Sequence, residues 1–173
     1  YRILSLFFIF SALAGQNFPF SIGGSNNESV YEMAVDNSGN IYITGTFNGT
    51  VDFDPGTGTT NITSSTSTEV YFAKYSSNGD LVWANSIAGT QGTEGESLAV
   101  DNSGNVYITG YLNGTADFDP GSGTMNLTAA GDDIYFAKYD SNGNLVWAKN
   151  FGSSFSSIGK SITTDNSGNI YLT

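Results

Sequence analysis

The sequence predicts an all-β fold in which one small antiparallel sheet is copied along the chain. The stretch Asp36 to Gly45 returns at Asp101 to Gly110, and its first nine positions return at 165–173. Repeat offsets of this size indicate one structural unit used several times. The chain also holds 22 Gly, 12 Phe and 10 Tyr, a composition typical of short strands joined by tight turns.

The first 14 residues differ in character from the repeats. Arg2 precedes an apolar run over residues 3–14, which is too short to span a bilayer as a mature anchor. The run ends in Ala12-Leu13-Ala14, which fits the small-x-small pattern before a signal-peptidase cleavage site. We therefore predict a signal peptide over residues 1–14, with a secreted or cell-surface product and no membrane insertion after cleavage. The alternative is a buried N-terminal core element.

Each full repeat contains four strand-like runs bounded by turn residues. The second run of each copy is long and is interrupted at Asn48-Gly49 or Asn113-Gly114, so it contains either a bulge or an extra small hairpin. The predicted strands cover residues 29–35, 40–53, 69–75 and 81–87 in the first copy, and residues 96–100, 105–118, 133–139 and 145–151 in the second.

The connections between these strands alternate between short and long. Residues 36–40 and 76–80 have Asn, Asp and Gly in the pattern of tight hairpin turns. Residues 54–68 and 89–95 form longer loops rich in Gly, Thr and Ser. Because successive turns of an up-and-down sheet lie at opposite ends, the tight turns share one rim and the long loops share the other.

Several strands carry apolar residues on both faces, as in residues 70–73 and 81–84. A sheet with one face in water would alternate more cleanly, so these sheets must be covered on both sides by neighbouring sheets. A β-propeller, with four antiparallel strands per blade, has this arrangement. The fold predicted is an incomplete propeller ring, with two full blades and partial blades at both ends.

The repeats divide the chain into segments. Phe18 lies 18 residues before Asp36, as Trp83 lies 18 before Asp101, so the segment around Phe18 matches the last strand of a blade. We expect this strand to complete the final blade and close the ring. The propeller region then covers residues 15–173, with an orphan outer strand at 18–23, blades at 29–88 and 96–151, and the start of a further blade at 158–173.

The repeated motifs resemble those of a known family, the bacterial SBBP β-propeller repeat. The similar motifs are Asp36 to Gly45, Phe47 to Gly56, Tyr71 to Tyr75 and Gly79 to Ala84, and the second copy of the Phe47 motif has Leu112 in place of the Phe. The resemblance covers almost everything after residue 17. It implies an exported propeller within large bacterial surface or secreted proteins, and it implies no particular activity.

Composition and charge exclude several kinds of function. The chain has no Cys and no His, which removes thiolate and imidazole metal sites, disulfides and His-dependent nucleophilic triads. There are 16 acidic and 5 basic residues, a net charge of −11. This acidic excess repels phosphate backbones and argues against nucleic acid as a partner; solubility alone also explains it.

Carboxylates on the long-loop rim are the candidate metal ligands. Asp52 and Asp54 stand two residues apart before a Pro-Gly turn, and Asp117 and Asp119 repeat the pattern. Oxygen ligands of this kind suit Ca²⁺, although two carboxylates fall short of its six to eight ligands. The competing interpretation is ordinary Asp-Pro-Gly turn chemistry. No other cofactor is expected.

The function predicted is an exported, non-enzymatic propeller that acts as a binding or scaffold module for an unknown protein or glycan ligand, with the long-loop rim as its contact surface. The alternative is a carbohydrate-active propeller enzyme that uses loop carboxylates as acid and base. Asp52, Asp54, Asp117 and Asp119 simply repeat from blade to blade, whereas Glu94 and Glu96 do not. Because active sites are seldom repeated in every blade, the binding module is favoured and no catalytic residue is assigned.

Overall fold

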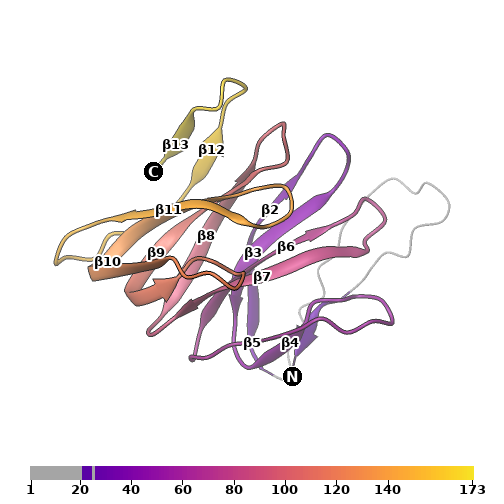
Figure 1. Ribbon diagram of the computed structural model, residues 1–173, viewed down its shortest axis with the longest axis horizontal. Helices are drawn as coiled ribbons and strands as arrows, with labels where there is room; N and C mark the ends of the chain where they lie inside the picture. The colour runs from indigo at the N-terminus through magenta and orange to yellow at the C-terminus, as the bar shows by residue number, and fades with distance from the viewer. Residues whose placement is uncertain (1–20, 25) are drawn as a thin grey trace.

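The computed structural model describes residues 21–24 and 26–173, and within them all regular secondary structure is β-strand. Figure 1 shows the strands arranged as sheets that fan out from one edge. The strands are β1 Gly23–Gly24, β2 Glu28–Val35, β3 Ile41–Phe47, β4 Thr50–Asp52, β5 Asn61–Thr63, β6 Glu69–Tyr75, β7 Leu81–Gly89, β8 Thr93–Val100, β9 Val106–Asp117, β10 Asn126–Tyr139, β11 Leu145–Phe151, β12 Ile162–Thr164 and β13 Ile170–Leu172.

The strands group into blades of four. The first blade is an antiparallel sheet of β2, β3, β6 and β7, and the second is formed in the same way by β8, β9, β10 and β11. The hairpin of β12 and β13 begins a third blade. The fold class predicted from the sequence, an incomplete β-propeller, is confirmed.

The two full blades are connected by a short backbone ladder at one corner. The end of β7 pairs with the end of β9, with Ala88 opposite Asp117 and Gly89 opposite Ala116. Thr90 N donates to Thr115 O beside these pairs, and elsewhere the blades meet mainly through side chains, face against face. The sheets are therefore stacked and do not form one continuous sheet.

The main apolar core lies between the two blades. Tyr42, Val70 and Phe72 from the first blade pack in one cluster with Leu98 and Tyr139, among others, from the second. The rings of Phe72 and Tyr139 lie 4.3 Å apart between centroids. A second cluster, which includes Phe47, Phe53 and Tyr71, covers the other face of the first blade. Since both faces are covered, all seven residues of β3 are buried.

Each blade carries an additional small hairpin. In the first blade it is a separate pair of strands, β4 with β5; in the second it is an extension of β9 and β10. From the sequence, either a bulge or a small hairpin was expected at this point, and the structure has a hairpin. Gly49 and Gly114 mark the break with φ angles of +72° and +73°, a conformation that favours glycine. The sequence did not predict β5, and the long loop that it predicted at 89–95 is a short connection, because β7 ends at Gly89 and β8 begins at Thr93.

The first described residues repeat the contact between blades. Gly23 and Gly24 pair with Asp52 and Val51, the same register as Ala88 and Gly89 with their partners in β9. Ile22 is buried, as is Ile87 at the equivalent position. Residues 22–24 therefore lie where the end of a preceding blade's last strand belongs. The orphan strand at 18–23 extends beyond the described residues and stays a prediction, and so does the signal peptide at 1–14.

No helix in the described part of the chain is long and apolar enough to cross a membrane.

The core between the blades leads to a stability prediction. Replacing Phe72 with Ala removes a fully buried ring and should lower the free energy of unfolding by about 3–5 kcal/mol. Phe136 is the equivalent residue of the second blade and is only half-buried, so Phe136→Ala is the matched control and should cost less. Chemical denaturation of both variants measures the difference. Equal losses would contradict the stacked-blade core.

Candidate functional site

The recurring Asp of each repeat organises a tight turn. Oδ1 of Asp36 accepts hydrogen bonds from the backbone amides of Ser38 (2.8 Å) and Asn40 (2.9 Å). Oδ2 accepts from the Asn40 side chain (2.8 Å) and from the Tyr42 hydroxyl (3.1 Å). The same set is present around Asp101 and Asp165. The most conspicuous polar motif of the sequence is therefore a backbone cap.

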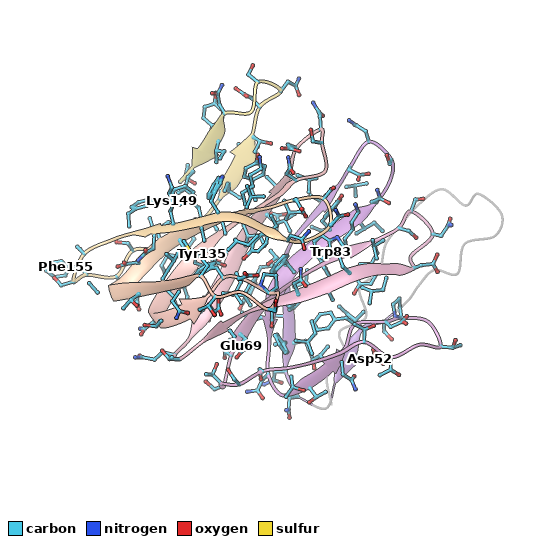
Figure 2. All side chains as sticks on the ribbon, in the orientation of Figure 1. Asp52, Glu69, Trp83, Tyr135, Lys149 and Phe155 are labelled. Carbon is cyan, nitrogen blue, oxygen red and sulfur yellow. The ribbon has the colours of Figure 1, made fainter. Side chains whose placement is uncertain are left out.

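The tight turns of neighbouring blades are linked to one another along one rim. Asn37 Nδ2 donates to Asn102 Oδ1 at 3.4 Å, and Asn102 Nδ2 donates to Asn166 Oδ1 at 3.3 Å. Trp83 Nε1 donates to the backbone oxygen of Ser141 at 3.2 Å, which ties the first blade to a turn of the second. Trp83, labelled in Figure 2, therefore lies at the junction between the two blades.

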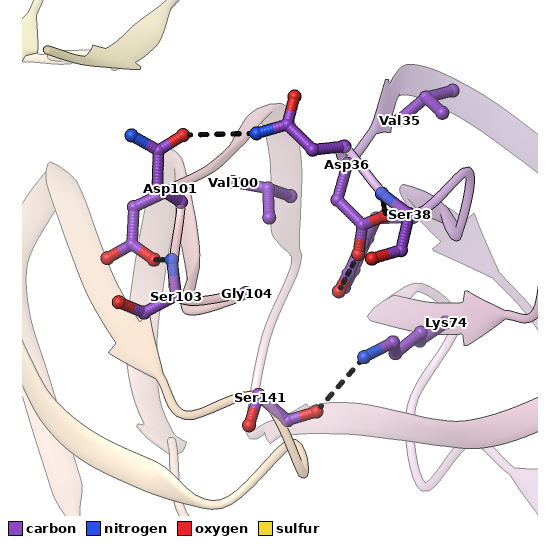
Figure 3. Close-up of a pocket in the computed structure, with 12 residues that line it drawn as sticks. Val35, Asp36, Ser38, Lys74, Val100, Asp101, Ser103, Gly104 and Ser141 are labelled. Atoms are coloured by element: carbon purple, nitrogen blue, oxygen red, sulfur yellow. Dashed lines mark hydrogen bonds between the residues drawn. The ribbon is translucent and has the colours of Figure 1, made fainter. Parts of the chain in front are cut away.

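A cavity of about 230 Å³ opens on this rim between the first two blades. Figure 3 shows Asp36 and Asp101 on its two sides with Lys74 below them. Lys74 Nζ lies 3.5 Å from the backbone oxygen of Ser141 and 5.1 Å from the centroid of the Tyr42 ring. Because the two carboxylates already accept several hydrogen bonds each, the cavity is mainly a gap between capped turns.

The aspartates of the long-loop rim also close loops. Asp52 Oδ1 accepts from the backbone amides of Asp54 (3.0 Å) and Thr60 (2.8 Å), and Asp54 Oδ1 accepts from Gly56 (2.8 Å). Asp117 and Asp119 make the matching bonds in the second blade. The structure thus places each pair together at a strand end, as predicted, and gives each pair a turn-closing role.

A metal at these pairs needs other ligands. Within residues 21–24 and 26–173, no three His, Cys, Asp or Glu side chains are grouped so that they could hold an ion. The remaining Ca²⁺ ligands would have to be backbone oxygens and water. Calcium binding by Asp52, Asp54, Asp117 and Asp119 stays a prediction of the sequence.

Side chains that differ from repeat to repeat gather on the first strand of each blade. These strands, β2, β8 and β12, lie close together where the blades converge, which we call the axial edge. Tyr31 on β2, Glu96 on β8 and Lys160, just before β12, are equivalent by repeat, 65 and 64 residues apart. Lys160 Nζ contacts Glu96 Oε1 at 2.8 Å across the second junction.

A second non-repeating pair lies beside this position. Glu94 and Tyr111 are opposite each other on β8 and β9, and the Tyr111 hydroxyl donates to Glu94 Oε1 at 2.9 Å. Burial and this hydrogen bond both raise the pKa of Tyr111. The first blade has Ser29 and Thr46 at the equivalent places. Glu94 and Glu96 were already distinguished in the sequence as carboxylates that do not repeat.

Sequence reasoning missed Tyr31, Tyr111 and Lys160 because none belongs to a motif. Aligning the three repeats and asking which position changes its chemistry each time would have found the position of Tyr31, Glu96 and Lys160.

Comparisons with known proteins agree with the repeat architecture. A family model described as "SBBP: Beta-propeller repeat" matches residues 13–51, 70–119 and 146–173, more than half of the chain. The chain is 31% identical over 126 residues to an uncharacterized WD repeat-containing protein, L264, of Acanthamoeba polyphaga mimivirus. It is 26% identical over 128 residues to the regulatory protein FlaEY of Caulobacter vibrioides.

These matches cover 67% and 72% of this chain but only 9% and 13% of the two relatives. The chain therefore spans a small part of each relative's length.

The capped turns predict a dependence of stability on acid. Burial alone would raise the pKa of Asp101, but hydrogen bonds from Asn105, Ser103 and Tyr107 outweigh it and hold the pKa below the ordinary value of 3.8. The unfolded chain therefore binds this proton first as the pH falls. The stabilisation is fully present above about pH 5 and is lost as the pH drops through the folded-state pKa.

Asp36, Asp140 and Asp165 have pKa values lowered in the same direction by their own turns. The free energy of unfolding should therefore fall between pH 5 and pH 3, and Asp101→Asn should reduce that slope. Asn105→Ala keeps the carboxylate but removes a donor, so it should reduce the slope in part. Urea denaturation at several pH values measures the slope of the free energy of unfolding against pH. An unchanged slope in Asp101→Asn would contradict the capping role.

Proposed function

The chain belongs to the SBBP β-propeller repeat family, and from this premise we propose that it is part of an exported, non-enzymatic propeller that acts as a binding or scaffold module at the cell surface or outside the cell. Its contact surface is the long-loop rim, where the first strands of the blades begin. The ligand is a protein or a glycan.

One observation carries this proposal: the Asp residues that recur are used by the framework, whereas one position on the axial edge carries a chemically different side chain in each repeat. Asp36, Asp52 and their copies accept backbone hydrogen bonds inside their own loops. Tyr31, Glu96 and Lys160 change from aromatic to anionic to cationic at one position. A binding surface built on repeats becomes specific through such changes.

The comparisons fit a module of this kind. The relatives are named as a repeat protein and a regulatory protein, and neither name describes an enzyme. The alternative of a carbohydrate-active enzyme needs an acid and a base among loop carboxylates. The repeated aspartates are engaged by backbone amides, which leaves Glu94 and Glu96 as the residues on which that alternative depends.

We propose export because residues 3–14 form an apolar run that ends in a candidate cleavage site, Ala12-Leu13-Ala14. Residues 1–20, preceded by an initiating methionine, should direct a leaderless alkaline phosphatase to the periplasm of a Gram-negative host, where its disulfides form and it becomes active. Phe8→Asp interrupts the apolar run and is the control. Activity that is absent, or equal in Phe8→Asp, would argue against a signal peptide.

Binding at the long-loop rim is testable by photo-crosslinking in producing cells. A benzophenone side chain at position 31 on the axial edge, or at exposed position 57 in a long loop, should form adducts with a ligand. The same group at exposed position 77 in a tight turn is the matched control. Adducts from position 77 alone, or from no position, would contradict the proposal.

A further inference from the structure

We propose that the axial edge binds a neutral saccharide chain, with Tyr31 as the apolar platform and Glu94, Glu96 and Lys160 as the groups that exchange hydrogen bonds with its hydroxyls. This inference rests on the proposed function and adds the chemical class of the ligand.

The fold itself turns the central position of the site out of the sheet. The register of β2 with β3 shifts between Val30 and Glu32, and that of β8 with β9 shifts between Gly95 and Ser97. Tyr31 and Glu96 are therefore the bulged residues of their strands. A bulge redirects a side chain away from the regular alternation and is often found next to binding sites.

A recurring glycine permits this bulge. A Cβ on Gly45 would lie 1.8 Å from the backbone oxygen of Ser29, and one on Gly110 would lie 1.9 Å from that of Glu94. The Gly that ends the repeated Asp-to-Gly motif is thus required by the close approach of the bulged strand. The framework preserves the bulge in each full blade while the residue placed on it changes.

The side chains on this position are accessible and are not needed for the core. Tyr31 is 45% exposed, and the side chain of Lys160 is 60% exposed. The ion pair of Lys160 with Glu96, whose side chain is 21% exposed, lies near the surface, and such pairs contribute little to stability. These side chains are therefore available to contact a ligand.

Glu94 is oriented by a residue that changed with it. In the first blade the opposite pair is Ser29 with Thr46, and in the second it is Glu94 with Tyr111. The hydroxyl of Tyr111 donates to Glu94 Oε1, which fixes the carboxylate on the side of β8 that faces the third blade. A carboxylate fixed in this way accepts hydrogen bonds from a ligand without first losing side-chain freedom.

The combination of groups selects the class of ligand. Sugar hydroxyls both donate and accept hydrogen bonds, so they suit carboxylates, which only accept, and an ammonium, which only donates. The C–H face of a sugar ring suits an exposed aromatic ring. A polyanion is disfavoured by the net charge of −11.

The test is native gel electrophoresis of the whole protein in gels that contain laminarin, hydroxyethylcellulose, xylan or galactomannan, with alginate as the polyanion. We expect at least one neutral polysaccharide to slow the protein and alginate to have no effect. Tyr31→Ala and Glu96→Gln should each weaken this affinity by about tenfold, the usual effect of losing one ligand contact. Ser77→Ala, in a tight turn, is the control and should leave the affinity unchanged.

Thermal melting shows whether each variant is folded, and Lys160→Met at a well-exposed side chain provides a further variant if Tyr31→Ala does not fold. No retardation by any neutral polysaccharide, or equal retardation of the protein and its axial variants, overturns the saccharide inference. A crosslink from position 31 to a protein, without polysaccharide binding, overturns this inference and leaves the binding module in place. Absence of both overturns both.

Discussion

The structure depends on one constraint: a four-stranded sheet with apolar residues on both faces needs another sheet against each face. Equivalent residues show the effect directly. Leu98 is 5% exposed because the first blade covers it, whereas Met33, at the same place in the first blade, is 42% exposed. Phe72 is fully buried beneath Tyr139, and its copy Phe136 is only half-buried. Burial in this fold is therefore a property of the junction between blades, as in other repeat proteins.

That constraint explains why the repeats are so similar. A tight turn must return the chain between two covered strands, so Asp36 caps its own backbone and Gly39 takes a φ of +80°. The second strand must approach a bulged neighbour so closely that a side chain would not fit, and position 45 is therefore a glycine, Gly45. Side chains that meet no such demand, such as Tyr31, vary from blade to blade.

The sequence predicted the strands well because they combine apolar periodicity with a repeat. It missed β5 because Asn61-Ile62-Thr63 is a three-residue strand within a Thr- and Ser-rich loop. It located Asp52 and Asp54 at a strand end, but the hydrogen bonds that occupy them depend on loop geometry that no spacing reveals. The partners at the axial edge, Glu96 and Lys160, are 64 residues apart and meet only when blades stack.

The short backbone ladder between β7 and β9 has a mechanical consequence. Ala88 and Gly89 belong to one blade by sequence but pair with the next blade, so pulling the chain ends apart loads the hydrogen bonds of this ladder as well as the side-chain contacts. Separating the two blades therefore means breaking backbone hydrogen bonds together with the apolar contacts between their faces.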